Sequence, residues 1–576
     1  MDKLHIIDTL GSFVEPTDQE VINWSKVDFS NLETNGRLRA DVRRRIEKHF
    51  ETYTLRIKAL GYNAMSFDDL AHLTVLPCYN SSLSLLLRDY SLLYKRLFSI
   101  AKQQDIKILI NTDYLFRNND IDNLMNEQHL TNEEMFIKIL TIAFESFPEI
   151  DGVILRIGEN DGKDVKSRFL SRLTLRTPDK TNALLKKALP IFESYNKILI
   201  FRTWTVGVYR VGDLIWNKRT FDTVFASIDS NALIISMKFG DTDFMTYLQL
   251  NPLFFISNHK KIIELQTRRE WEGMGTYPSF VGWDYSRYFQ ELADNDTIVG
   301  IHVWCQTGGW AKKEWTNITF LKNSSFWNEL NTYVTVKMYH ERCSVESAIT
   351  VFCHEYTIKD VTEFIRLLQL SEIAIKQGLY IRELAEQQLY FRRLRVPTLL
   401  WITWDTISLR PMNLFLIRAL IIHPEIAIQE AHTAVTATIE MISIAEKIKL
   451  KETVIASLRF QNATLLLFIG IKKHLLGVGQ TVDLPKLQRQ INTYHSQFPQ
   501  HYTISRLKST GTKSRYTHFY HLLLGGLFLR KKSSYRKRDK IFLATSPIQL
   551  WIVQYYLRKT KSHLNNQSMG IDVLFR

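Results

Sequence analysis

The first 335 residues alternate short apolar runs with longer segments in which apolar residues recur every three or four positions. The short runs are rich in Ile, Val, Leu and Phe, which is typical of strands buried on both faces. The longer segments have the period of amphipathic helices. Helices are predicted, among others, over 41–60, 85–104, 132–147, 183–195 and 280–292. Strands are predicted over 4–9, 64–67, 106–111, 152–157, 198–204, 233–238, 262–266 and 299–304.

This alternation predicts the fold class. Strands and helices that follow one another at this spacing indicate a parallel α/β sheet. Eight such units favour a closed (β/α)₈ TIM barrel over an open doubly wound sheet. An open nucleotide-binding sheet would need a glycine-rich turn after its first strand, and neither G-x-G-x-x-G nor G-x-x-x-x-G-K-[ST] occurs in the sequence.

The periodicity changes after the predicted barrel. We expect residues 1–335 to form a catalytic (β/α)₈ barrel, 336–500 a mostly α-helical domain, and 501–576 a basic C-terminal segment. Helical periods in the second part cover 360–377, 379–394, 412–421 and 432–447. An exposed helical domain after a barrel is a possible surface for a homodimer.

The positive charge is concentrated in the last part of the chain. The formal net charge is +15, and residues 451–576 hold 21 Lys and Arg against 4 Asp and Glu, a surplus of 17. The first 450 residues therefore carry a net charge of −2. The basic segment is either a solvated surface or a contact for a polyanion such as an acidic glycan, nucleic acid or anionic lipid.

The remaining composition excludes several classes. The N-terminus lacks a positive region followed by an apolar stretch, and no apolar run approaches the roughly 20 residues that span a bilayer. We therefore expect a cytoplasmic protein without a transmembrane segment. The 4 cysteines are too scattered for a disulfide framework. Cys343, Cys353 and His354 lack a second pair of ligands, so no metal and no cofactor is expected.

Polar side chains follow the predicted strands from the second onward, where the active site of such a barrel is built. One polar strand end has no significance, but seven in one barrel indicate a functional site. These residues are Asp68, Asp69, Asn111, Asp113, Arg156, Glu159, Arg202, Trp204, Lys238, Asp241, Asp243, Glu264, Gln266, His302 and Trp304.

Several of these residues also have structural explanations. Asp68 and Asp69 fit a supporting or helix-capping role better than a catalytic one. His302 fits a hydrogen-bonded barrel histidine better than a base. Arg202 and Lys238 could simply neutralise nearby acids.

Paired carboxyl groups at strand ends are typical of glycoside hydrolysis. One group must be protonated to donate to the leaving oxygen, and the other must be ionised, as nucleophile or as base. Crowding and burial can separate two such pKa values. Glu159 is the candidate acid, while Glu264 and Asp243 compete for the ionised role.

Other strand-end residues are predicted to bind the substrate. Trp204 and Trp304 offer a flat apolar floor for a sugar ring. A cationic set can bind a substrate carboxylate, with arginine forming a bidentate fork. The predicted substrate-binding residues are Arg156, Arg202, Trp204, Lys238, Asp241, Gln266, His302 and Trp304.

Two segments resemble a known family. Gly240-Asp-Thr-Asp243-Phe244 is followed by Glu264-Leu-Gln-Thr-Arg-Arg-Glu-Trp-Glu-Gly273. This pair is similar to Gly-x-x-Asp-Phe and Glu-Phe-Gln-x-x-x-Glu-Tyr-x-Gly in glycoside hydrolase family 67, the α-glucuronidases. The likeness covers about residues 150–310.

The resemblance implies a barrel with a helical C-terminal domain that cleaves acidic oligosaccharides inside the cell with inversion. It places the acid on Glu159 and the base on Asp243 or Glu264. Acids after strands four and seven also resemble the large retaining clan of barrel glycosidases, so the stereochemistry stays open. Glu270 and Glu272 are expected to position the loop or to cap the next helix.

The leading interpretation is therefore a glycoside hydrolase for a uronic-acid-containing oligo- or polysaccharide, with a carboxylate pair at the barrel mouth. Two alternatives are a non-catalytic glycan-binding barrel and an adaptor in polysaccharide metabolism.

Overall fold

The computed structural model falls into two units by the contacts within the chain. The barrel unit comprises Met1–Asp241, Leu250–Arg268 and Val281–Ala348, and the helical unit comprises Thr242–Gln249, Arg269–Phe280 and Ile349–Arg576. The structure describes residues 3–14, 26–158, 168–171, 173–205, 209–306, 319–322, 324–391, 393–400, 406–409, 414, 417–418, 420–479, 483–499, 501, 503–508 and 529–530. Glu159 and nearly all of the basic C-terminal segment lie outside these residues.

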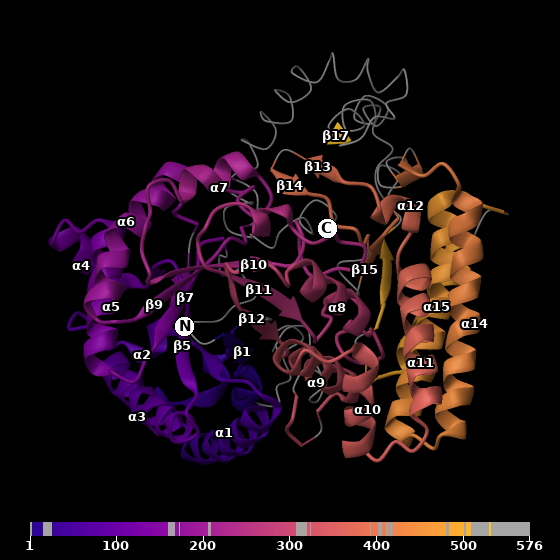
Figure 1. The fold of residues 1–576 in the computed structure, drawn as a ribbon, viewed down its shortest axis with the longest axis horizontal. Coiled ribbons are helices and arrows are strands. Elements are labelled where there is room, and N and C mark those ends of the chain that lie inside the picture. The colour runs from indigo at the N-terminus through magenta and orange to yellow at the C-terminus, as the bar shows by residue number, and fades with distance from the viewer. Residues whose placement is uncertain are drawn as a thin grey trace. The chain divides into compact units, whose positions relative to one another are not determined.

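Eight parallel strands close into a barrel, which confirms the predicted fold class (Figure 1). Around the barrel the order is β1, β12, β11, β10, β9, β7, β5, β4, and β4 pairs with β1 to complete the ring. Each predicted strand is found within one or two residues of its expected ends. The strands are β1 (Leu4–Asp8), β4 (Ala64–Asp68), β5 (Lys107–Asp113), β7 (Gly152–Arg156), β9 (Ile198–Arg202), β10 (Leu233–Lys238), β11 (Lys261–Gln266) and β12 (Ile298–Trp304).

Helices cover the outside of the barrel, and local signals set their ends (Figure 1). Thr131 and Glu134 form a capping box at the start of α5, and Gly61 takes the left-handed conformation at the end of α1. The α-helices of this unit are α1 (Ala40–Leu60), α2 (Leu70–Leu73), α3 (Ser81–Gln103), α4 (Asn119–Glu127), α5 (Asn132–Ser146), α6 (Pro178–Ser194), α7 (Lys218–Val224), α8 (Gly282–Glu291) and α9 (Phe326–Glu341). Its short elements are η1 (Leu10–Phe13), η2 (Phe29–Leu32), η3 (Pro252–Phe255), β2 (Glu33–Thr34), β3 (Arg37–Leu38), β6 (Phe116–Arg117) and β8 (Leu170–Ser171).

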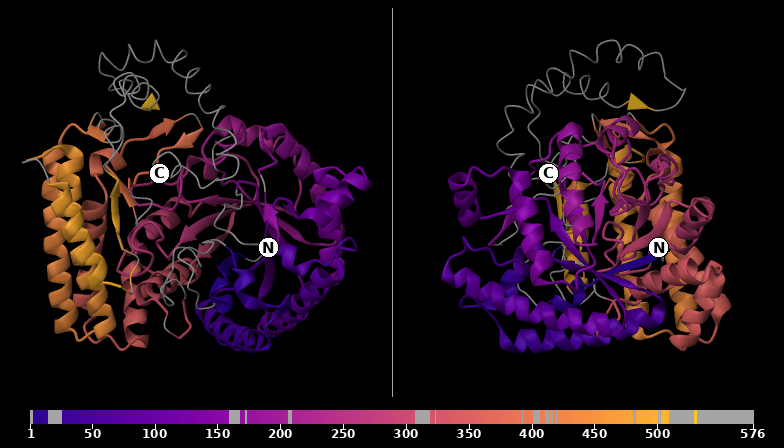
Figure 2. Two further views of the ribbon diagram at one scale, coloured as in Figure 1. Left: turned by 180° about the vertical axis from the view of Figure 1, so that it is seen from behind. Right: turned by 60° about the vertical axis from the view of Figure 1, so that its left-hand side comes forward.

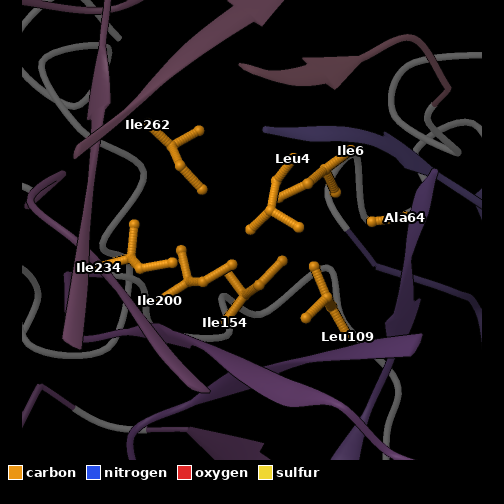
Figure 3. Close-up of a cluster of buried hydrophobic side chains, with 8 residues drawn as sticks. All are labelled: Leu4, Ile6, Ala64, Leu109, Ile154, Ile200, Ile234 and Ile262. Carbon is orange, nitrogen blue, oxygen red and sulfur yellow. The ribbon is translucent and has the colours of Figure 1, made fainter. Parts of the chain in front are cut away.

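A single apolar cluster fills the interior of the barrel near the start of the strands. Its side chains converge from seven of the eight strands (Figure 3). They are fully buried, so this end of the barrel is a packed core rather than a pore. The cluster consists of Leu4, Ile6, Ala64, Leu109, Ile154, Ile200, Ile234 and Ile262.

Long helices dominate the helical unit, as the sequence predicts, and α11, α14 and α15 lie side by side (Figures 1 and 2). The helices of this part are α10 (Val345–Glu355, which begins in the barrel unit), α11 (Val361–Ile373), the π-helix η4 (Ala374–Leu379), α12 (Arg382–Ala385), α14 (Pro424–Lys447), α15 (Glu452–Leu476) and α16 (Leu484–Gln497). The strands are β13 (Leu389–Phe391), β14 (Leu394–Arg395), β15 (Thr406–Ser408), β16 (Arg506–Lys508) and β17 (Leu529–Arg530).

The helix predicted over 379–394 is wrong. Within it, α12 covers only Arg382–Ala385, and β13 pairs antiparallel with β14 and β17. Tyr and Phe in β13 favour extended backbone, and pairing with distant strands outweighs a weak local helical period. Half of the helix predicted over 412–421 lies outside the described residues, and the described positions 414, 417, 418 and 420 are helical.

Within the described residues, one helix, α15, is long and apolar enough to cross a membrane by length and composition alone. Of its most apolar 18-residue window, 61% is buried inside the structure. A core helix of a soluble protein meets the same criterion, and α15 packs against α14 and α16.

Candidate active site

The inward face of each barrel strand changes from apolar to polar along its length. Side chains two residues apart lie on the same face of a strand, so the residues that follow the apolar cluster also point inward. They are Asp8, Ser66, Asn111, Arg156, Arg202, Ser236 and Glu264, and His302 takes the same place on β12. The next inward positions hold Asp68, Asp113, Lys238, Gln266 and Trp304. The layer of inward side chains directly above the apolar cluster is therefore already polar.

Glu264 on β11 is fully buried and accepts four hydrogen bonds. Arg202 binds it bidentately, with Nε 2.9 Å from Oε1 and Nη2 2.8 Å from Oε2. Ser236 Oγ donates to Oε1 at 2.8 Å, and Trp304 Nε1 donates to Oε2 at 3.2 Å. Burial alone would raise the pKa of Glu264, but the Arg202 charge and its hydrogen bonds outweigh burial and lower it to about 2. The carboxylate is thus ionised, and its four acceptor positions are used.

His302 lies beside this ion pair on β12. Its ring centroid is 4.2 Å from that of Trp304, and Nε2 is 3.4 Å from Ser66 Oγ. Burial lowers the pKa of His302 to about 3, against the opposing effect of Glu264. The imidazole is therefore neutral near pH 7, as expected for a buried histidine of the barrel wall that carries no charge.

Lys238 and Trp204 form a cation–π pair at the ends of β10 and β9. Lys238 Nζ lies 3.6 Å from the centroid of the Trp204 ring, within the range of a strong contact. Lys238 is buried and Trp204 is half-buried. Asp241 is half-buried in the turn after β10. The backbone of Gln266 is held by the Tyr285 hydroxyl, which accepts from its N–H at 3.0 Å and donates to its carbonyl at 2.7 Å.

Arg156 belongs to a second buried ion pair. Its Nε lies 2.8 Å from Asp113 Oδ1, while Lys26 Nζ donates to Asp113 Oδ2. Burial raises the pKa of Asp113, but the charges of Arg156 and Lys26 outweigh it and hold that pKa well below its usual range. Arg156 and Arg202 thus both neutralise carboxylates, the structural alternative that the sequence left open for Arg202.

Two further inward carboxyl groups, Asp8 and Asp68, have unusual acidity. Burial raises the pKa of each to about 7. The Cys305 and Gln306 N–H groups oppose this by donating to Asp8 Oδ2 at 2.8 and 3.0 Å. For Asp68, the main opposing effect is the Arg156 charge. Asp69 is the N-cap of α2 and accepts from the His72 N–H, which confirms the capping role for this residue.

Asp243 belongs to the helical unit, in the loop that continues from β10. It is half-buried, and its Oδ1 accepts from the Phe244 N–H at 2.9 Å. Three residues further on, the Thr246 N–H and hydroxyl donate to Glu272 Oε1 at 3.0 and 2.7 Å.

Glu272 is the centre of a buried network that fixes two loops of the helical unit. Arg269 Nε lies 3.0 Å from Oε2, Ser279 Oγ donates to Oε2 at 2.6 Å, and the Tyr380 hydroxyl donates to Oε1. Glu272 therefore positions the loop, as expected from the sequence. The same network holds the backbone at Thr246, three residues after Asp243.

Sequence reasoning did not select Asp8 or Ser236. The usable signal was the two-residue period, since Asp8 follows Leu4 and Ile6, and Ser236 lies between Ile234 and Lys238 on one face. Asn111, Asp113 and Asp68 were recognised as strand-end residues but not assigned to the site. The candidate acid Glu159 lies outside the described residues, so its role stays a prediction.

Comparisons with known proteins identify the fold. No protein-family profile and no curated protein matches the chain. The chain resembles the structure of a GH138 enzyme targeting pectin rhamnogalacturonan II, with a TM-score of 0.54 and 10% identity, over 91% of this chain and 67% of that one. A mutant O-GlcNAc hydrolase of Thermobaculum terrenum matches with a TM-score of 0.37 and 9% identity, over 79% of this chain and 88% of that one. The match to the GH138 structure agrees with the TIM-barrel fold and does not single out family 67.

Proposed function

We propose that this protein is a glycoside hydrolase that acts on acidic glycans containing uronic acids. The observation that carries the proposal is the Lys238–Trp204 pair at the ends of β10 and β9. Lys238 Nζ covers one face of the half-buried indole, so the other face is the one that would take a sugar ring. The ammonium attracts a carboxylate. Recognition of a charged sugar needs both features in one place.

The carboxyl groups divide into different roles in this proposal. Glu264 is an unsuitable base, because four protein donors occupy its oxygens and it is fully buried. We assign it the positioning of Arg202 and Trp304. Asp243 for the ionised role and Glu159 as the acid that protonates the leaving oxygen stay predictions from the sequence.

The proposed substrate class is pectic. Rhamnogalacturonan II is the named target of the GH138 enzyme whose structure this chain resembles, and the Lys238 ammonium suits a uronic acid in such a glycan. Cleavage of an α-glucuronide is a narrower version of the same proposal.

Hydrolysis of pectin tests the proposal. We expect the protein to release uronic-acid-terminated products from rhamnogalacturonan II, detected as new reducing ends and by mass spectrometry. Lys238→Met should lower kcat/KM at least tenfold on the acidic glycan, because the cation is lost while the apolar stem remains. The matched control is Lys218→Met, on the exposed surface of α7, which should change nothing. Equal rates for Lys238→Met and wild type would contradict the proposal.

The saturated Glu264 also favours a second candidate, a non-catalytic glycan-binding barrel. A carboxylate that accepts from four protein donors fixes those donors rigidly, and a binding site needs such an anchor no less than an active site does. Binding of acidic oligosaccharides by calorimetry, without any product after long incubation, would support this candidate over the hydrolase.

A further inference from the structure

Asp68 and Asn111 lie side by side on the inner wall of the barrel. They are register partners at the adjoining strands β4 and β5, which lie about 4.8 Å apart as neighbouring strands do. Asp68 lies on the same face of β4 as Ala64, and Asn111 on the same face of β5 as Leu109. Both reference residues belong to the apolar cluster inside the barrel (Figure 3). Because side chains two residues apart share a face of a strand, both polar side chains point into the barrel.

Each side chain has a buried oxygen that the described residues leave without a hydrogen bond. Asp68 is 0% exposed and Asn111 is 1% exposed. Among the described residues, Asp68 Oδ1 and Asn111 Oδ1 accept nothing. The other carboxylate oxygen, Asp68 Oδ2, accepts from the Val27 N–H at 2.9 Å. A buried acceptor without a donor costs about 1–3 kcal/mol, and a donor that arrives from outside the fold would remove that cost at both oxygens.

The surroundings define what that donor is. The neighbouring cation Arg156 is already paired with Asp113 at 2.8 Å, and Lys26 donates to the same carboxylate. No group of three or more metal-ligating side chains occurs among the described residues, so two oxygens, one of them from a neutral amide, make a poor cation site. Two adjacent acceptors on a rigid wall suit a pair of neighbouring hydroxyl groups, each of which donates one hydrogen bond.

We propose that Asp68 and Asn111 form a subsite that binds adjacent hydroxyl groups of a sugar ring through Asp68 Oδ1 and Asn111 Oδ1. The proposal rests on the proposed function, because it takes the ligand to be a sugar. The subsite adds hydrogen bonds to the ring hydroxyl groups, and these do not depend on the substrate carboxylate. Lys238 and Trp204 would recognise the charge, and this pair would recognise the hydroxyl pattern.

The decisive variant is Asn111→Leu, which replaces the amide with an apolar group of similar shape. The probes are D-galacturonic acid, D-galactose and the monodeoxy derivatives of D-galactose, with binding measured by calorimetry. We expect Asn111→Leu to weaken binding of both sugars about tenfold, while the apo protein is as stable as wild type or more stable, since an unsatisfied polar group has been removed. Asn111→Asp, which keeps an acceptor, should restore binding.

The matched control is Asn182→Leu on α6, where the amide donates to the carbonyls of Val224 and Ala226 at 2.9 Å. This control should lose stability and keep its sugar affinity, the reverse of Asn111→Leu. For wild type, at least one monodeoxy derivative should bind about tenfold more weakly than D-galactose. Asn111→Leu should bind that derivative and D-galactose with equal affinity.

Equal sugar affinity in Asn111→Leu and wild type would overturn the subsite, as would wild-type protein that binds none of the probes. A galactose-soaked crystal with only an ordered water on both oxygens would also overturn it. Hydrolysis of rhamnogalacturonan II in any of these cases would leave the hydrolase proposal standing. Conversely, sugar binding that depends on Asn111, without hydrolysis of any glycan, would support the subsite and remove the hydrolase.

Discussion

The four hydrogen bonds to Glu264 limit what that carboxylate can do. A base or nucleophile must present a free lone pair to water or to the anomeric carbon, and here Arg202, Ser236 and Trp304 occupy all four acceptor positions. The residue type and its strand-end position were visible in the sequence. Its partners were not, because they come from three other strands.

Glu264→Gln should destabilise the protein strongly. The amide cannot accept from all four donors, and the Arg202 charge stays buried without an anion, so the free energy of unfolding should fall by about 3–5 kcal/mol. Chemical denaturation measures the loss. The matched control is Glu291→Gln, whose carboxylate lies 3.7 Å from Arg287 on an exposed helix face and should change stability by no more than about 0.5 kcal/mol. Similar stabilities for the two variants would show that Glu264 is not the anchor inferred here.

Asp8 should make folding stability depend on pH. Its pKa is about 7 in the folded protein and near 3.8 in the unfolded chain. The folded state therefore holds a proton that the unfolded state has released, so this residue lowers stability as pH rises from about 4 to about 7. Asp8→Asn, which keeps an acceptor for the Cys305 and Gln306 N–H groups, should remove that part of the decline.

Denaturation curves at several pH values between 4 and 7 measure the effect. Asp222→Asn, on the exposed surface of α7, is the control and should follow wild type throughout. If Asp8→Asn also follows wild type, the carboxyl group of Asp8 titrates at its ordinary pH.

At the scale of elements, the barrel was predictable because each strand is a short apolar run between long amphipathic helices. The local pattern of apolar residues does not show which distant segments pair with one another. The sequence of β13 has a helical period, yet this strand pairs with β14 and with β17, which lies more than 130 residues further along the chain. Similarly, the two-residue period shows which side chains point inward, but it does not show which of them bind one another.

Gly300 makes closure of the barrel between β1 and β12 possible. A Cβ at this position would lie 2.2 Å from the carbonyl oxygen of Leu4, its register partner, so the backbones would have to separate. We expect Gly300→Ala to lower the free energy of unfolding by about 1–3 kcal/mol, as overpacking does.

Gly470→Ala provides the comparison for Gly300→Ala. On α15 the nearest atom to an added Cβ is a flexible side-chain methyl of Leu487 at 3.1 Å. Alanine is the better helix former by about 1 kcal/mol, so this variant should be as stable as wild type or more stable in thermal and chemical denaturation. Equal losses in the two variants would point away from barrel closure as the cause.

At the scale of the whole molecule, the two units are not continuous in sequence. The loops Thr242–Gln249 and Arg269–Phe280, which follow β10 and β11, belong with residues beyond 348. A periodic pattern assigns residues to a domain by their position along the chain. It has no means of assigning a loop of the barrel region to a unit formed mainly by later residues, because that assignment depends on buried groups such as Glu272.

The Glu272 network has a consequence for synthesis on the ribosome. Tyr380, one of its donors, lies 108 residues after Glu272. At translation rates of about 5–20 residues per second, the nascent loop therefore waits roughly 5–20 s for that hydroxyl group. During this interval the carboxylate of Glu272 has Arg269, Thr246 and Ser279 as its available partners. The hydrogen-bond network of Glu272 is complete only after Tyr380 has been synthesised.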